Sequence, residues 1–231
     1  MAAAELDVDQ VVTPVRATLR KQRNDHFMLG EVTGIYLAGR AVTVAGQRIG
    51  YDYLILANAT TSAFMGTPGA AEHAFPLRTL DESLALRSHM LERFEQASLA
   101  ASVEERRRHL TFMIVGGGPT GVEFAGALSE LVRGPLTKDF DNLNLRDVRI
   151  VLLESHDRIL AHLPDPGLSA YAAKRLTKMG IEVRTSSRVQ AVEPGVVTLK
   201  DGTRIEIGTT VWTAGVEARP LAKECGLPVN M

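Results

Sequence analysis

The sequence contains a single cysteine, Cys225, so it forms no intramolecular disulfide and holds no cysteine pair that could serve as a redox centre. Such sparse cysteine usage is typical of proteins from a reducing cytosol. The histidines are scattered without the H-E-x-x-H spacing of a metal-binding helix, and we therefore expect no metal site. A G-x-S-x-G nucleophile elbow is also lacking, which leaves no sign of hydrolase chemistry.

Long apolar runs and an excess of one charge are missing as well. No apolar stretch approaches the roughly 18 residues of a membrane-spanning helix, and the first residues lack the basic start and apolar core of a signal peptide. We therefore expect a cytoplasmic location. A net charge of −1 provides no attraction to nucleic acid, which we do not expect as a partner. The 231 residues suffice for one large domain or two small ones.

The chain does contain a glycine-rich turn between an apolar strand and an apolar helix, within residues 110–128. Gly116, Gly118 and Gly121 follow the G-x-G-x-x-G spacing that opens a dinucleotide-binding βαβ unit. In that motif the first glycine permits a tight turn, the second lets a pyrophosphate approach, and the third lets the helix pack on the strand. The positive end of the helix then faces the phosphates. A glycine turn without a ligand stays open as an alternative, because isolated motif matches occur.

An acidic residue, Glu154, ends the next apolar strand, which we place at residues 148–154. In dinucleotide folds a carboxylate at this position accepts hydrogen bonds from the adenosine ribose and disfavours the extra phosphate of NADP. Glu154 therefore predicts NADH. The gap from Gly121 exceeds the usual gap of about 20 residues, so an insertion is required, and the irregular residues 133–146 supply it. The alternative is an acidic strand end on a solvated loop.

The remaining pattern predicts an α/β fold with a parallel sheet and a β-meander. Residues 51–57 form a near-continuous apolar run, which predicts a strand covered on both faces. Residues 60–78 are rich in glycine and proline and predict a connection between two structural units. A helix of about three turns should start at Thr13 and Pro14. The other expected elements are meander strands at 27–37, 40–45 and 48–49, helices at 81–97 and 165–179, and strands at 181–184, 188–192, 196–199, 204–207 and 209–213.

Several phrases together resemble the type II NADH dehydrogenases of the FAD- and NAD-binding pyridine nucleotide-disulfide oxidoreductase superfamily. These phrases are residues 13–20, 30–35, 51–57, 115–125 and 211–216. The Pro-Thr-Gly-Val-Glu continuation of the glycine motif and the Trp-Thr-Ala-Gly segment are the most specific of them. The resemblance implies a Rossmann-like NAD-binding domain at 79–215, inserted in an FAD-binding domain of which 1–78 and 216–231 are parts. It further implies a non-proton-pumping respiratory enzyme that passes a hydride from NADH to FAD and electrons on to a quinone.

The same resemblance assigns roles to individual residues. Glu123 would lie near the nicotinamide and the flavin as a catalytic residue, which we favour over the alternative of an acid in the first helical turn that only stabilises the helix dipole. Ala214 and Gly215 would line the nicotinamide through their backbones, and Val32 would meet the FAD adenine. The pyrophosphate of NADH would lie against Gly116, Gly117, Gly118, Pro119, Thr120 and Gly121, with Glu154 on the ribose.

The sequence departs from the family pattern at the FAD site. Residues 57–60 read Ala-Asn-Ala-Thr where the family has Ala-Thr-Gly-Ala, so Ala59, next to Thr60, replaces the glycine that lets the backbone approach FAD. The family's first glycine motif would precede residue 1, and its quinone site and amphipathic membrane helices would follow Met231. We therefore expect a fragment, with peripheral membrane contact only through segments outside it; a homodimer is compatible with this. Two alternatives are a truncated NADH-binding module without FAD and a disulfide reductase relative, the latter without the thioredoxin-reductase arrangement because no C-x-x-C occurs.

Overall fold

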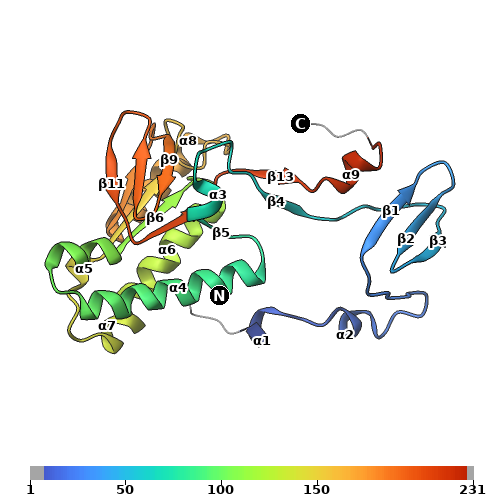
Figure 1. Cartoon of the computed structure of the whole chain (residues 1–231), viewed down its shortest axis with the longest axis horizontal. Helices are drawn as coiled ribbons and strands as arrows, with labels where there is room; N and C mark the ends of the chain where they lie inside the picture. The colour runs from blue at the N-terminus through green and yellow to red at the C-terminus, as the bar shows by residue number, and fades with distance from the viewer. Residues whose placement is uncertain (1–7, 228–231) are drawn as a thin grey trace. The chain divides into compact units, whose positions relative to one another are not determined.

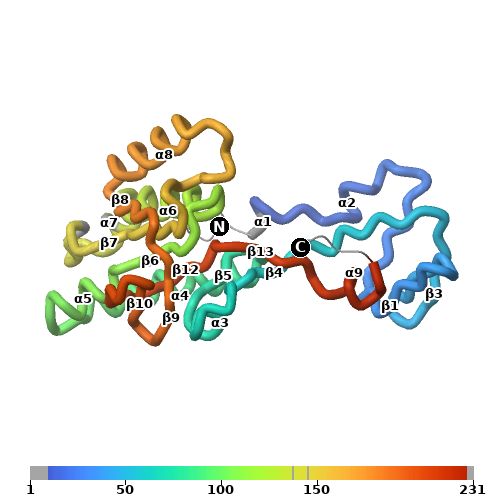
Figure 2. The backbone as a smooth tube through the Cα atoms, turned by 90° about the horizontal axis from the view of Figure 1, so that it is seen from above, coloured from blue at the N-terminus to red at the C-terminus, as the bar shows by residue number. Residues whose placement is uncertain are grey.

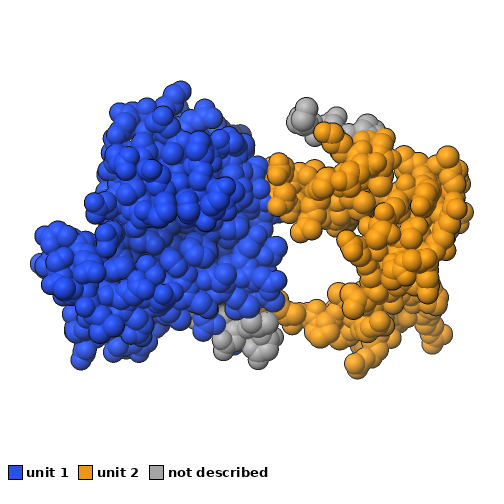
Figure 3. All heavy atoms as spheres, in the orientation of Figure 1, with its two compact units in different colours: residues 1–10, 62–215 blue, residues 11–61, 216–231 orange. Residues whose placement is uncertain are grey.

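The computed structural model describes residues 8–227, and these divide into two compact units, coloured separately in Figure 3. Unit 1 contains residues 62–215 and the described residues before Val11; unit 2 contains residues 11–61 and 216–227. Unit 1 thus includes residues 62–78, which the sequence pattern assigns to the FAD-binding part. The reason is that β5 (Phe75–Pro76) pairs with the central sheet of unit 1. The assignment of domains to NAD and FAD stays a prediction.

Unit 1 (Figure 1) is built around a five-stranded parallel sheet in the order β5-β12-β6-β7-β8, whose strands are labelled in Figure 2. The chain runs from β6 through β7 to β8 and then returns to place β12 on the other side of β6, so the winding reverses at β6. This is the strand order of a dinucleotide-binding fold, whose ligand site lies where the winding reverses. The further bounds are β6 Thr111–Val115, β7 Arg149–Leu153, β8 Ile181–Arg184 and β12 Thr209–Trp212.

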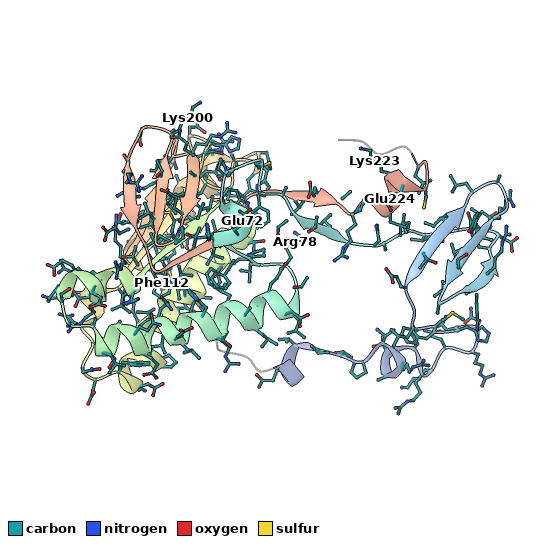
Figure 4. All side chains as sticks on the ribbon, viewed as in Figure 1. Glu72, Arg78, Phe112, Lys200, Lys223 and Glu224 are labelled. Carbon is teal, nitrogen blue, oxygen red and sulfur yellow. The ribbon has the colours of Figure 1, made fainter. Side chains whose placement is uncertain are left out.

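Both faces of this sheet are covered, because β6 is buried at all five positions. Alternate side chains of a strand point to opposite faces: Phe112, labelled in Figure 4, packs in the core formed with the helices, whereas Met113 packs in the core formed with a small antiparallel sheet. Helices α6 and α8 lie side by side (Figure 2). The helices of unit 1 are α3 Ala70–His73, α4 Leu80–Leu99, α5 Val103–His109, α6 Pro119–Arg133, α7 Pro135–Asp139, η1 Leu145–Asp147 and α8 Pro166–Lys178.

The small antiparallel sheet confirms the hairpin pattern of the sequence. Its strands are β9 Val189–Glu193, β10 Val196–Leu199 and β11 Arg204–Glu206, paired in that order. Gly202 follows Asp201 in the turn between β10 and β11 with a φ of 86°, a conformation that favours glycine. The buried faces of the three strands contribute Val192, Val197 and Ile205 to the second core. This sheet therefore covers the face that the helices leave open.

Unit 2 contains the expected β-meander, an antiparallel sheet in the order β1-β2-β3. Its first strand is shorter than predicted, since β1 begins at Val32 and not at Phe27. The bounds are β1 Val32–Tyr36, β2 Ala41–Val44 and β3 Gln47–Gly50, with helices α2 Val15–Leu19 and α9 Leu221–Glu224. A two-stranded sheet pairs β13 Val216–Ala218 with β4 Thr60–Ser62, whose last residue is counted with unit 1. A short helix, α1 Val8–Val11, lies at the start of the described chain.

Two sequence predictions for unit 2 are wrong. Residues 51–57 form no strand, and Tyr53 and Ile55 are 94% and 91% exposed. A strand needs a neighbouring strand to satisfy its backbone groups, and none of the described strands pairs with this segment. The helix after Pro14 covers only Val15–Leu19, because it buries no residue, and a short helix without packing is marginal in water.

His89 on α4 joins that helix to the start of β12 and should make unit 1 sensitive to acid. Its Nε2 lies 3.3 Å from the Gly208 carbonyl oxygen and 3.1 Å from the Thr209 hydroxyl oxygen. Burial lowers the pKa of His89 from its usual 6.5, and the opposing effect of the Gly208 carbonyl is smaller. The unfolded chain therefore binds a proton more readily than the folded chain.

We expect the contribution of His89 to the free energy of unfolding to be lost as the pH falls from about 6.5 towards the lower pKa of the folded state. In His89→Gln, which keeps a hydrogen-bonding side chain, the dependence should be shallower. Urea unfolding from about pH 8 to about pH 5 measures both slopes. His109, whose pKa burial also lowers, should leave part of the slope in the variant. Equal slopes in the two proteins would contradict this role of His89.

Candidate functional site

A cavity of about 540 Å³ opens in unit 1 at the carboxyl ends of β6, β7 and β12. This is where the winding of the sheet reverses, the usual place for a ligand in an open α/β fold. The loops that follow these strands, the loop after β8 and residues before α3 form its wall. It is lined by Met65, Thr67, Val115, Gly116, Gly117, Gly118, Leu153, Glu154, Ser155, His156, Ala161, His162, Ser187, Arg188, Val189, Trp212, Thr213, Ala214 and Gly215.

The glycine turn between β6 and α6 is packed against protein at its first and last glycines. Gly116 has a φ of 110°, and a Cβ there would come within 2.8 Å of the Ala214 backbone nitrogen. A Cβ on Gly121 would collide with the Gly116 carbonyl oxygen and lie 2.8 Å from the Thr213 hydroxyl oxygen. Close approach of helix and strand therefore requires glycine at both positions, as the motif predicts.

The second glycine of the motif, Gly118, differs from these two. A Cβ on Gly118 would meet no protein atom within 4 Å, although this residue is the N-cap of α6. Its backbone thus faces open space at the start of a 15-residue helix, with Pro119 in the first turn and no side chain capping the end. Helix N-termini present amide donors and partial positive charge, which bind phosphate. The chain therefore provides a place where an anionic group can approach the backbone.

Glu154, at the end of β7, is tied to the glycine turn. Its Oε2 accepts a hydrogen bond of 2.8 Å from the Gly117 amide, and its Oε1 accepts one of 2.8 Å from the His156 amide. The Ser155 hydroxyl donates to Oε1 at 3.1 Å, and the His156 ring Nδ1 lies 2.7 Å from the same oxygen. The side chain thereby joins the first turn of the nucleotide motif to the loop after β7.

Burial alone would raise the pKa of the Glu154 carboxyl, since the residue is only 8% exposed. The hydrogen bonds from His156, Gly117 and Ser155 together outweigh burial and hold the pKa below its usual value of 4.5. Glu154 is thus ionised at neutral pH. A fixed negative charge in the cavity wall disfavours a second anionic group beside it.

Another wall of the cavity is formed by the segment at the end of β12, which contains the Trp-Thr-Ala-Gly phrase. The Trp212 indole donates hydrogen bonds to the carbonyl oxygens of Ala63 (3.0 Å) and Ala214 (2.8 Å). The Thr213 hydroxyl lies 2.9 Å from the Val115 carbonyl oxygen and 3.1 Å from that of Gly116. These bonds hold the chain after β12 against the end of β6, and so fix the backbone of Ala214.

The structure brings together six of the predicted site residues around the cavity: Gly116, Gly117, Gly118, Glu154, Ala214 and Gly215. Gly121 packs behind them. Pro119, Thr120 and Glu123 are exposed on α6 and do not line the cavity, and Val32, Ala59 and Thr60 belong to unit 2. The roles of these residues therefore stay predictions.

Sequence reasoning missed other residues of the cavity wall, among them Met65, His156, His162 and Arg188. Of these residues, only His156 could have been suspected from the sequence, since it lies two positions after Glu154. Met65 lies in the loop before α3 and Arg188 in the loop after β8, and only the tertiary structure brings these loops to the cavity. In residues 8–227 no three His, Cys, Asp or Glu side chains gather in a way that could hold a metal ion. No helix in the described part of the chain is long and apolar enough to cross a membrane.

Ala59 adopts a left-handed backbone conformation with a φ of 57°. This conformation favours glycine, and it costs other residues about 1–2 kcal/mol. We expect Ala59→Gly to raise the free energy of unfolding of unit 2 by about 1 kcal/mol, because the strain is removed. Urea unfolding, with hydrogen exchange of residues 57–63, measures the change. The control Ala57→Gly should bring no gain, since Ala57 has no positive φ; equal effects of the two variants would contradict the prediction.

Comparison with known proteins supports the fold and the family. In curated sequences, the type II NADH:quinone oxidoreductase Ndh of Mycobacterium tuberculosis is 37% identical, covering 97% of this chain and 50% of the relative. The mitochondrial external alternative NAD(P)H-ubiquinone oxidoreductase B1 of Solanum tuberosum is 33% identical, covering 95% and 41%. The solved structure of NDH2 from Plasmodium falciparum in complex with NADH has a TM-score of 0.87 at 20% identity, covering 96% and 48%.

The structural likeness confirms the Rossmann-like α/β fold class. The chain spans about half the length of the curated relatives it matches. The family model described as pyridine nucleotide-disulphide oxidoreductase matches residues 2–231, which is nearly the whole chain. The resemblance that the glycine motif and the Trp-Thr-Ala-Gly segment indicated is thereby confirmed, and the chain belongs to the pyridine nucleotide-disulphide oxidoreductase family.

Proposed function

We propose that this chain is part of a flavin-dependent NADH:quinone oxidoreductase, in which unit 1 binds NADH and unit 2 contributes to the FAD site. The observation that carries the proposal is the open space beside Gly118, within a turn whose other motif glycines are packed against protein. A backbone left bare at a helix N-terminus suits a pyrophosphate. The names of the relatives, which describe NADH:quinone and NAD(P)H-ubiquinone oxidoreductases, support the same activity.

Each wall of the cavity has a separate task in this proposal. The Gly118 backbone and the amides that follow Pro119 in the first turn of α6 bind the phosphates, since the Gly116 and Gly117 amides already donate to Leu153 and Glu154. Glu154 accepts a hydrogen bond from the adenosine ribose. Ala214 and Gly215 position the nicotinamide from the other wall, and Glu123, exposed on α6, is the proposed catalytic residue. Residues 79–215 then form the NAD domain, with 1–78 and 216–231 as parts of the FAD domain. FAD, when bound, supplies the acceptor for the hydride and the donor of electrons to quinone.

The FAD contacts in unit 2 are the less favourable part of this assignment. Val32 opens β1, Thr60 opens β4, and Ala59 directly precedes β4. Ala59 presents a Cβ in a left-handed conformation where a glycine would let a ligand approach the backbone. This observation favours a second candidate function, an NADH-binding module that does not retain FAD. For the first candidate, the flavin-dependent enzyme, the partner is a membrane quinone at the cytoplasmic face of the membrane.

Flavin absorbance and NADH titration of the purified chain separate the two candidates. Stoichiometric flavin together with NADH binding is the expected result for the enzyme, and quinone reduction by the flavin-loaded protein would complete it. NADH binding without flavin would support the binding module and exclude activity of the isolated chain. If NADH does not bind, both candidates are wrong.

A further inference from the structure

The hydrogen bonds of Glu154 leave it little capacity for a nucleotide. Oε1 already faces three donors, the amide and ring Nδ1 of His156 and the hydroxyl of Ser155, while Oε2 accepts from the Gly117 amide. A carboxylate oxygen offers about two lone pairs. Oε1 is therefore saturated, and Oε2 retains room for about one further donor. The adenosine ribose of a dinucleotide carries two neighbouring hydroxyls, so one of them needs another acceptor.

His156 offers that acceptor. His156 lines the cavity, and its side chain is 69% exposed. Because Nδ1 lies 2.7 Å from a carboxylate oxygen, Nδ1 carries the proton in the neutral ring and Nε2 is left as an acceptor. No described residue hydrogen-bonds to Nε2. The backbone at this position is also held, since the Ser186 amide donates to the His156 carbonyl oxygen at 2.6 Å. The acceptor is therefore fixed in place at the cavity.

We propose that His156 is a specificity-determining residue of the nucleotide site, whose Nε2 accepts a hydrogen bond from one ribose hydroxyl while Oε2 of Glu154 accepts from the other. This rests on the proposed binding of NADH. The extra phosphate of NADPH replaces a ribose hydroxyl and offers no donor to these acceptors, so the pair favours NADH over NADPH.

Two substitutions of His156 distinguish the roles of its two ring nitrogens. Asparagine can retain a donor near the Nδ1 position but has no group at the Nε2 position, whereas glutamine can place its amide oxygen near Nε2 without a donor at Nδ1. We expect His156→Asn to weaken NADH binding by about 3- to 10-fold, the effect of one hydrogen bond, and His156→Gln to retain most of the affinity. The control is His73→Gln, at an exposed histidine that ends α3 and does not line the cavity, which should bind NADH like the unmodified chain.

The measurement is a titration of the whole chain with NADH and with NADPH, followed by nicotinamide fluorescence. The ratio of NADH affinity to NADPH affinity should fall in His156→Asn and stay near that of the unmodified chain in His156→Gln. Normal affinity in His156→Asn, or equal losses in the Asn and Gln variants, would overturn the proposal, because the ring would then act only through Glu154 or through the fold. Melting temperatures show that the variants are folded. Failure of the unmodified chain to bind NADH would instead overturn the proposed function, and this inference with it.

Discussion

Replacing Gly121 by alanine is expected to abolish NADH binding and to lower the free energy of unfolding of unit 1 by about 3 kcal/mol. The added Cβ would collide with the Gly116 carbonyl oxygen and approach the Thr213 hydroxyl oxygen within 2.8 Å. Neither atom can retreat easily, because the Thr213 hydroxyl and amide both bond to the Val115 carbonyl at the end of a fully buried strand. The start of α6 would have to move away from β6, and the phosphate site would move with it.

Gly118→Ala is the matched control for this prediction. Its φ of −74° suits alanine, and no protein atom lies within 4 Å of the added Cβ. The melting temperature should therefore stay near that of the unmodified chain, while the Cβ occupies space that the pyrophosphate needs and weakens NADH binding by tenfold or more, about 1.4 kcal/mol. Thermal unfolding and NADH titration of both variants test the pair. Unchanged NADH affinity in Gly118→Ala would show that the phosphates do not approach there.

Glu154→Arg is expected to weaken NADH binding by about tenfold or more and to shift the preference towards NADPH, because the guanidinium attracts a phosphate. It should also lower the free energy of unfolding by about 3 kcal/mol. The Gly117 and His156 amides, which now donate to the carboxylate, would face a second donor in a site that is only 8% exposed. The stability loss and the change of preference thus have separate causes.

Affinities for NADH and NADPH, measured together with urea unfolding, separate these two effects. Glu206→Arg is the control, since Glu206 is exposed on β11 and does not line the cavity. It should change neither the stability nor the coenzyme preference appreciably. A loss of stability in Glu154→Arg with an unchanged ratio of affinities would mean that the carboxylate only fastens the loop after β7 to the glycine turn.

Much of unit 1 could be predicted, because its elements are defined by local patterns. The apolar strand before Gly116, the helix after Gly118 and the acid at Glu154 are each explained by neighbours in the sequence, and the structure has them as expected. The α4 helix followed in the same way from its apolar spacing, and its capping box of Thr79 and Glu82 fixes its start. Such features depend on residues a few positions apart, which the sequence displays directly.

The two wrong predictions have one physical cause: a local sequence pattern does not show whether a segment has tertiary partners to pack against. The run at 51–57 has the composition of a covered strand, yet none of the described strands pairs with it. The short helix after Pro14 has an apolar stripe but buries no residue. Propensity and periodicity state what a segment can do, whereas packing decides whether it does so.

The sequence by itself determined the glycine turn, the acid that follows it and the family to which the chain belongs, because each resides in contiguous residues. Only the tertiary structure decided which of the three motif glycines faces a ligand: Gly116 and Gly121 are packed against Ala214 and against the turn itself, and Gly118 alone is bare. It also decided that hydrogen bonds from Gly117, Ser155 and His156 occupy most of the acceptor capacity of the Glu154 carboxylate. These contacts arise where β6, β7 and β12 end side by side, and no local pattern records which strands will be neighbours.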